Sequence, residues 1–431
     1  MSGLMARARS LATSPGAVYL GAAVLSRLGA IVLVPLYTRT LELDEYGRYA
    51  LFTSMLGVMP HCLSLGLNAG LTKAYFDAPD DEGGTRALGT VGRGLIVVVL
   101  GNALWVSLLA IPLLQALAGV GAHETALCVV GAAAIVVAGV PEGWMRIRER
   151  AFAAAGWSLA TFASNVVFGL LFVLALQRGY DGAIAAPVAG ALLMALASAA
   201  LVLRLPREPD VKAATWRAVV FSLPLVPHYL ATWLQGAGDR WVISAFGADA
   251  DLGIYYLAVQ IASPLPMLVS AWNSATWPGV GRLARDSGPA ALRPELRRLE
   301  RNALLVSLAP AAAMLALTPV IALMIGERFH GALSLLPAVA LCHVVDALYY
   351  PSSNVLYFLG RVRMVPVFTV ISAILGLGLA ALLLPRYGIW GLLVARVAGS
   401  TVQASGLAIT ARVALRKTLK GSEVAVGDVK D

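Results

Sequence analysis

The sequence predicts an all-α polytopic membrane protein, with twelve transmembrane helices arranged in two halves of six. The first observation is composition: of 431 residues, 59% are hydrophobic and only 13% are charged, with a mean hydropathy of +0.77. Soluble proteins carry about 25% charged residues, and a soluble chain of this size needs polar groups to cover its surface. The other two observations are long apolar runs and a segregation of basic residues between loops. A soluble nucleic-acid-binding protein is therefore excluded, despite the net charge of +9.

Twelve runs reach the roughly 20 apolar residues that a membrane-spanning helix needs. The runs are continuous rather than alternating, which is typical of helices and not of barrel strands. The first run is too long for a signal-peptide core and no small-residue cleavage site follows it, so we expect it to be retained. The predicted spans lie near 17–37, 48–70, 91–117, 124–142, 156–177, 182–204, 218–238, 253–277, 302–325, 332–358, 364–385 and 388–411.

The distribution of Lys and Arg predicts that both termini face the cytoplasm. With this orientation, 25 basic residues fall in cytoplasmic segments, 6 in outer loops and 2 within spans, which accounts for all 33. Such an excess on one side follows the positive-inside rule. The +9 charge is therefore a topology signal, and it also favours contact with anionic lipids of the inner leaflet.

The sequence contains an internal repeat. Glu45–Tyr49 (EYGRY) recurs as Asp251–Tyr255 (DLGIY), and Gly182–Gly190 recurs as Gly391–Gly399 at nearly the same offset. Six spans per half predict parallel repeats, which typically place a substrate path at their interface. We predict a first repeat over 1–205, a cytoplasmic linker over 206–217, a second repeat over 218–415 and a cytoplasmic tail over 416–431.

The loop before the ninth span has an amphipathic pattern. Leu292, Leu296 and Leu299 fall on one helical face, and the arginines around them, such as Arg293 and Arg297, fall on the other. This pattern predicts a short helix lying on the anionic leaflet; a solvated linker is the alternative.

Polar side chains recur on one face of several spans, and such groups are costly in lipid unless they face protein or water. Matched stripes in the second and eighth spans and a third in the seventh span favour a water-filled cavity. Simple hydrogen bonds between packed helices are the alternative. The stripes comprise Ser54, His61, Ser64, Asn68 and Thr72; Gln260, Ser263, Ser270 and Ser274; and His228, Thr232, Gln235 and Asp239.

Three charged residues lie well inside spans. Arg27 is mid-span in the first run, where a charged group is rare and usually functional, so it is either a partner of an anionic headgroup or a structural contact. Asp346 shares a face with His343 in the tenth span, and Arg396 lies in the twelfth. Asp346 and His343 are candidates for coupling to H⁺ or Na⁺; the alternative for Asp346 is a static ion pair with Arg396.

The sequence contains none of the common catalytic, nucleotide-binding or metal-binding motifs. It contains no nucleotide-binding P-loop, zinc-protease motif or hydrolase elbow, and Cys62, Cys128 and Cys342 show no metal-ligand spacing. We therefore predict no catalytic residues, metal or cofactor, and read the three cysteines as small apolar core residues.

Several motifs resemble those of a known family. Pro35-x-Tyr37-Thr38-Arg39, the EYGRY segment and Leu65-Gly66-Leu67-x-x-Gly70-Leu71-x-Lys73 resemble the opening of the Wzx-type polysaccharide flippases. In the second half, Phe221–Leu225, Asp239–Ile243 and Gly253–Ala262 resemble the matching repeat. These flippases belong to the multidrug/oligosaccharidyl-lipid/polysaccharide (MOP) exporter superfamily. The family often carries arginine at the position of Lys73.

The resemblance implies a V-shaped bundle of six plus six helices in the bacterial inner membrane. It implies translocation of an undecaprenyl-diphosphate-linked oligosaccharide to the periplasmic leaflet by alternating access, as a transporter and not an enzyme. Membrane lipids, H⁺ or Na⁺, and polysaccharide polymerase and chain-length proteins are the expected partners. A drug or cation exporter and a membrane enzyme of polysaccharide assembly are the alternatives. The expected cavity residues are Arg27, His61, Asn68, Lys73, His228, Thr232, Gln235, Gln260 and Arg396.

Overall fold

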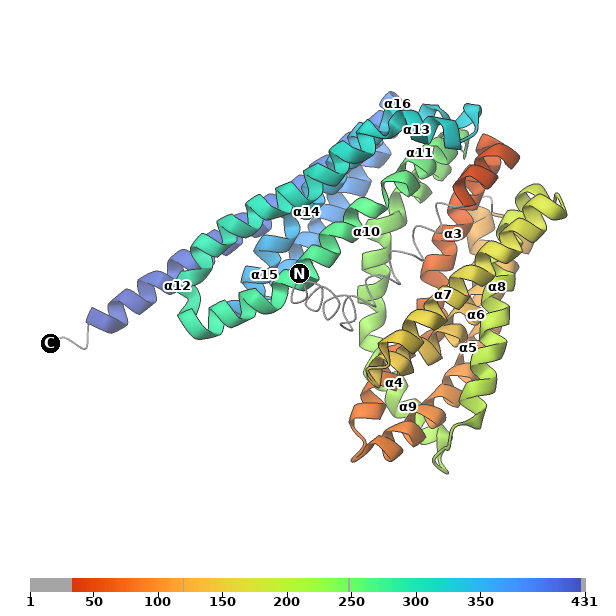
Figure 1. The fold of residues 1–431 in the computed structure, drawn as a ribbon, viewed down its shortest axis with the longest axis horizontal. Helices are drawn as coiled ribbons and strands as arrows, with labels where there is room; N and C mark the ends of the chain where they lie inside the picture. The colour runs from red at the N-terminus through yellow and green to blue at the C-terminus, as the bar shows by residue number, and fades with distance from the viewer. Residues whose placement is uncertain (1–32, 119, 247–248, 428–431) are drawn as a thin grey trace, which may run out of the picture. The chain divides into compact units, whose positions relative to one another are not determined.

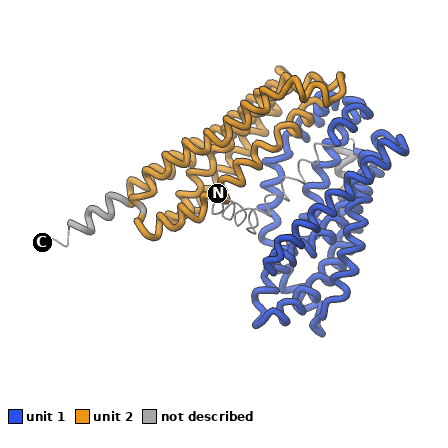
Figure 2. Tube along the Cα trace, in the orientation of Figure 1, with its two compact units in different colours: residues 1–253 blue, residues 254–431 orange. Residues whose placement is uncertain are grey.

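The computed structural model describes residues 33–118, 120–246 and 249–427, and these residues are helical throughout apart from short connections (Figure 1). They form two compact units, residues 1–253 and 254–431 (Figure 2). The predicted repeat boundaries concern sequence symmetry rather than packing, so they stay a prediction. The helices are α3 (Leu43–Ser64), α4 (Leu67–Phe76), α5 (Asp81–Ala118), α6 (Ala122–Ile147), α7 (Ala151–Gly169), α8 (Gly179–Arg204), α9 (Val211–Ser222), α10 (Val226–Ala245), α11 (Asp249–Ala262), α12 (Pro264–Ala316), α13 (Thr318–Met324), α14 (Gly331–Ala347), α15 (Tyr349–Phe358) and α16 (Met364–Gly427).

The predicted all-helical membrane fold is confirmed. Among the described residues, eight helices are long and apolar enough to cross a membrane, or nine if α3 and α4 form one broken span. Two long helices each cover more than one predicted run. Gly288 (φ 72°) interrupts α12 and Gly388 (φ 58°) interrupts α16, at positions where left-handed backbone favours glycine. Gly388 lies at the predicted boundary between 364–385 and 388–411.

The second predicted span is not one straight helix. Leu65 and Gly66 both adopt left-handed backbone, and α3 and α4 are bent by 50° at this break. A β-carbon on Gly66 would lie 3.0 Å from the carbonyl oxygen of Ser222, so α9 packs closely there. The expected continuous stripe is therefore wrong: His61 lies on α3, whereas Asn68 lies on α4 after the bend.

Unit 1 is built around α6, which packs most extensively against α8 and also contacts α3, α5 and α7. The buried hydroxyl of Ser198 on α8 donates to the carbonyl of Val137 on α6 at 2.6 Å. α9 and α10 also belong to this unit, since α9 packs on α4 and α5 and α10 packs on α3.

The start of α11 approaches α3 very closely. A β-carbon on Gly47 would lie 2.0 Å from the carbonyl oxygen of Asp249, and one on Gly253 would lie 2.2 Å from that of Leu43. Only glycine allows two backbones to approach this closely. Gly47 and Gly253 occupy equivalent positions in the predicted repeat.

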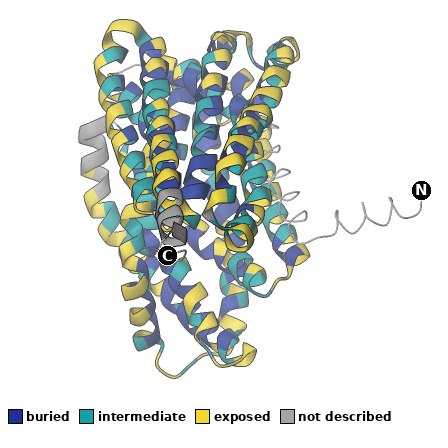
Figure 3. Ribbon diagram, turned by 90° about the vertical axis from the view of Figure 1, so that its left-hand side faces the viewer, coloured by how far each residue is buried: buried dark blue, intermediate teal, exposed yellow. Residues whose placement is uncertain are grey.

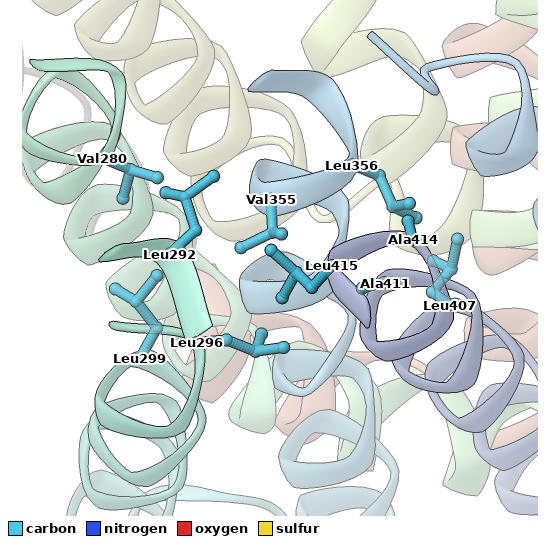
Figure 4. Packing of buried hydrophobic residues seen from close by; sticks show 10 residues of the cluster. All are labelled: Val280, Leu292, Leu296, Leu299, Val355, Leu356, Leu407, Ala411, Ala414 and Leu415. Carbon is cyan, nitrogen blue, oxygen red and sulfur yellow. The ribbon is translucent and has the colours of Figure 1, made fainter. Parts of the chain in front are cut away.

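The amphipathic segment of α12 packs against protein rather than lying on a leaflet. Leu292, Leu296 and Leu299 are at most 2% exposed, and they belong to a cluster with residues of α15 and α16 that include Val355 and Leu415 (Figure 4). The predicted surface helix is therefore wrong. A leucine stripe suits a lipid surface and a protein core equally well, and α15 and α16 are too distant in sequence to reveal which one covers it.

The outer surfaces of the helices remain apolar. Exposed residues cover much of the helix surface in Figure 3. On α5, for example, Leu104 and Trp105 are 64% and 67% exposed. Exposed apolar bands of this kind are what lipid tails would cover.

Candidate functional site

In unit 1, α10 is fixed on α3 by two tryptophans. The indole of Trp233 donates to the carbonyl of Ser54 at 2.9 Å, and the indole of Trp241 donates to the Ser54 hydroxyl at 3.0 Å. Ser54 is 2% exposed. This serine, which the sequence assigned to a cavity stripe, therefore forms a helix–helix contact, and the contact fixes the rotation of α10 about its axis.

A histidine–tyrosine stack lies along the same helix pair. The rings of His61 on α3 and Tyr229 on α10 are 4.7 Å apart and nearly parallel, at 14°. The ring of His228 lies 6.1 Å from that of Tyr229. The structure thus brings together two of the predicted site residues, His61 and His228, through an aromatic side chain that was not predicted.

The neighbouring face of α10 is polar and exposed. His228, Thr232 and Gln235 are all exposed and follow one another at helical spacing. The hydroxyl of Thr232 donates to the carbonyl of His228 at 2.9 Å. Together with the His61–Tyr229 stack, these residues present aromatic faces beside neutral hydrogen-bonding groups, and we call this set the α10 polar face.

Unit 2 contains the predicted ionisable cluster. The hydroxyl of Ser400 on α16 donates to Asp346 on α14 at 2.6 Å, and Nδ1 of His343 lies 3.7 Å from the other oxygen of Asp346. The side chain of Asp346 is 39% exposed, whereas that of His343 is 8% exposed. Neither ring nitrogen of His343 has a hydrogen-bond partner among the described residues.

Arg396 is a second charged neighbour of Asp346. Its guanidinium donates to the hydroxyl of Tyr255 on α11 at 2.9 Å. Further along the unit, the amide of Asn354 donates to that of Asn273 at 2.8 Å. Asp346 therefore belongs to a polar network that joins α14, α16 and α11, with contacts beyond the simple pair with Arg396, and the asparagine pair is a separate contact between α15 and α12.

The remaining predicted residues lie apart from these two groups. Asn68 is exposed on α4, and Gln260 is half-buried on α11. Lys73, also on α4, pairs with Asp77 at 2.7 Å. Arg27 lies outside the described residues.

Sequence reasoning missed a charged cluster in unit 1. Glu124, which is 7% exposed, pairs with Arg48 and accepts a hydrogen bond from Tyr180 at 2.7 Å. Arg48 also lies 4.8 Å above the Tyr180 ring. Glu124 stands at the first turn of a predicted span, where an acidic residue is ordinary helix-start chemistry. The aromatic residues of α10 were missed because an aromatic side chain in a span gives no polar signal, although the spacing of Tyr229 and Trp233 places them on one helical face.

Known structures with the same architecture are membrane transporters. An inward-facing multidrug resistance MATE transporter of the MOP superfamily matches with a TM-score of 0.72 and 17% identity, covering 91% of this chain and 96% of that one. An outward-facing structure of a multidrug resistance MATE family transporter of the MOP superfamily matches with a TM-score of 0.59 and 17% identity, covering 94% of each chain. A MOP superfamily transporter from Pyrococcus furiosus, whose description notes a binding pocket of reverse polarity, matches at 0.59 and 16%, covering 93% and 94%. The fold is that of MOP transporters.

The family follows from sequence. The family model for polysaccharide biosynthesis proteins matches residues 15–283, and the chain belongs to this family. The MatE family model matches residues 224–382. A search of curated protein sequences finds no significant match. The resemblance to polysaccharide flippases of the MOP superfamily is thereby confirmed.

Proposed function

We propose that this protein is a flippase that moves a lipid-linked oligosaccharide across the bacterial inner membrane, from the cytoplasmic to the outer leaflet. The substrate class is a glycan carried on a prenyl diphosphate. Glycosyltransferases would supply this substrate on the cytoplasmic side, and polymerase and chain-length proteins would consume it on the other.

The α10 polar face is the observation that carries this proposal. Binding sites combine aromatic and apolar surface with a few placed polar groups, and a neutral glycan needs ring faces and hydrogen bonds rather than fixed charge. The stack of Tyr229 on His61 and the exposed Thr232 and Gln235 supply both. The tryptophan contacts to Ser54 anchor α10 on α3 beside this surface.

A drug or cation exporter is the second candidate. The MatE match over residues 224–382 and the similarity to multidrug transporters favour it. Asp346 would then bind the cation. Its neighbours His343 and Arg396 oppose this role, because an organic cation would stay beside two basic groups without bonding to the carboxylate, whereas a proton bonds directly to a carboxylate oxygen.

The experiment is a flipping assay with purified protein in vesicles. The vesicles contain a fluorescent lipid-linked oligosaccharide, and a membrane-impermeant quencher reports which leaflet holds it. We expect Tyr229→Ala to lower the rate about two- to tenfold, the loss of one aromatic contact. Tyr229→Phe keeps the ring and is expected to stay within twofold of the wild type. If the oligosaccharide lipid flips no faster in vesicles with the protein than in empty vesicles, and the same protein expels a cationic dye, the exporter replaces this proposal.

We propose further that Asp346 and His343 couple this transport to an ion gradient. Moving one charge across the membrane releases about 2.3 kcal/mol per 100 mV, and a carboxylate that takes up H⁺ or Na⁺ on one side and releases it on the other would make this free energy available to transport. We expect Asp346→Asn to transport at a rate that no longer responds to an uncoupler, while Ser400→Ala keeps the response. An Asp346→Asn protein whose transport collapses normally with uncoupler contradicts this role.

A further inference from the structure

Unit 1 contains a cleft of about 460 Å³ between α4, the start of α5 and α9. This volume lies in the range of about 300–1,000 Å³ that is usual for small-molecule sites. Lys73 and Asp77 line it from the α4 side, and Arg217 and Phe221 line it from α9. The cleft is separate from the α10 polar face and lies at the end of the unit with the basic loops, which the sequence predicts to be cytoplasmic.

Close helix packing fixes the walls of this cleft. A β-carbon on Gly70 would lie 2.6 Å from the carbonyl oxygen of Ala218, so α4 and α9 are almost in backbone contact there. Lys73 follows Gly70 by three residues, and Arg217 and Phe221 flank Ala218. The contact therefore sets the two cationic side chains at the mouth of one cavity.

The cleft has two cations, Lys73 and Arg217, and two acidic residues, Asp77 and Glu208, so an anion would bind at the cations by displacing an acidic partner. The ammonium of Lys73 lies 5.3 Å above the ring of Phe221 and 2.7 Å from Asp77. An exposed pair of this kind, four residues apart on a helix, is weak, and a phosphate can replace the carboxylate. Arg217 is exposed and forms no ion pair with any residue that the structure describes. Guanidinium and ammonium groups are the usual protein partners of phosphate oxygens.

The residues around the cleft are of the types that are found at a membrane–water interface. Trp216 is 66% exposed next to Arg217, Phe76 is 66% exposed near Asp77, and Phe221 is 45% exposed at the cleft itself. Tryptophan is enriched where a membrane protein meets the membrane–water interface, and basic residues gather on its cytoplasmic side. A ligand that enters here would keep its apolar tail in the bilayer beside these rings and place its headgroup between the two cations.

We propose that the Lys73–Arg217 cleft binds the phosphate or diphosphate headgroup of a lipid from the cytoplasmic leaflet. This inference rests on the proposed flippase function and gives it a loading site, apart from the glycan-binding surface. Asp77 acts as an internal competitor, which occupies Lys73 until the headgroup arrives. Glu208, the other acidic residue of the cleft, discourages tight retention.

The test measures lipid binding to the full-length protein in nanodiscs of neutral lipid, by native mass spectrometry. The probe is undecaprenyl diphosphate without sugar, and inorganic pyrophosphate is titrated in parallel. We expect Lys73→Ala and Arg217→Ala each to weaken lipid binding about five- to tenfold, as loss of one charge-assisted contact does, and Lys73→Arg to retain it. Asp77→Asn should bind about two- to fivefold more tightly. Lys212→Ala removes an exposed cation of α9 that does not line the cleft, and it should stay within twofold.

Two results would overturn the inference. One is lipid binding that is unchanged in both alanine variants. The other is pyrophosphate binding as tight as that of the lipid, which would assign the cleft to a free anion. The opposite signs expected for Asp77→Asn and Lys73→Ala separate binding from misfolding. The probe carries no sugar and the test measures no transport, so the two proposals can fail separately. A drug exporter with this cleft would bind the lipid but would not flip the lipid-linked oligosaccharide. A flippase that loads its substrate elsewhere would flip the oligosaccharide, but its lipid binding would not depend on Lys73 and Arg217.

Discussion

Replacing Leu296 by alanine tests whether the amphipathic segment of α12 faces protein or lipid. Leu296 is 2% exposed in the cluster of Figure 4. Truncating a buried leucine removes its packing contacts and leaves a cavity, at a cost of about 2–5 kcal/mol in the free energy of unfolding. At about 2–4 °C per kcal/mol for a unit of this size, the melting temperature should fall by about 4–20 °C.

Leu305 provides the matched control on the same helix. It is 59% exposed, so its truncation exchanges contacts with lipid or detergent and opens no cavity inside the protein. The assay is thermal unfolding of both variants in the same detergent, followed by tryptophan fluorescence. Equal melting temperatures for Leu296→Ala and Leu305→Ala would show that the leucine face is not buried, and the surface-helix interpretation would return.

Two further substitutions test the packing of unit 1. Gly47→Ala places a methyl 2.0 Å from the carbonyl oxygen of Asp249, which must move away by about 1 Å to reach 3.0 Å. Such overpacking costs about 1–3 kcal/mol in the free energy of unfolding. The control is Gly101→Ala, whose methyl has nothing within 4 Å and which should be neutral or stabilising. A melting temperature for Gly47→Ala at or above that of Gly101→Ala contradicts the close approach. Glu124→Gln breaks an ion pair in which the glutamate is buried and the arginine is half-exposed, and it should lower stability by about 1–3 kcal/mol. The same change at Glu82, whose pair is exposed, should leave the melting temperature unaltered. Equal effects at the two glutamates would refute the role assigned to Glu124.

The sequence predicted the fold class because the constraint on a membrane helix is local. About 20 apolar residues must follow one another, and runs such as 124–142 and 182–204 correspond to α6 and α8 within a few residues at most ends. It failed where structure depends on distant partners. The break at Leu65–Gly66 is accommodated by α9, and the leucines of α12 are covered by α15 and α16.

The candidate site was predictable in part for the same reason. Charge inside a span is a local signal, and it led to Asp346, His343 and Arg396, which the structure brings into one network. The surface on α10 depends on tertiary contacts instead. In the sequence, Tyr229 and Trp233 are indistinguishable from ordinary apolar residues of a span. Only the structure shows their contacts with His61 and Ser54 of α3. Arg217 looked like a linker charge until the packing of α4 and α9 placed it at a cleft.

The contact between Gly47 and Gly253 has an evolutionary implication. In a symmetric dimer, a residue on the twofold axis meets its own copy in the partner. If the two halves arose by duplication, as the repeat predicts, these two glycines descend from one ancestral residue. The close approach of α3 and α11 would then derive from the contact between that residue and its copy in the partner of a symmetric dimer. In two separate identical chains, a single mutation would have inserted a methyl group on both sides at once. Fusion into one gene allowed each side to vary alone, yet both positions still hold glycine.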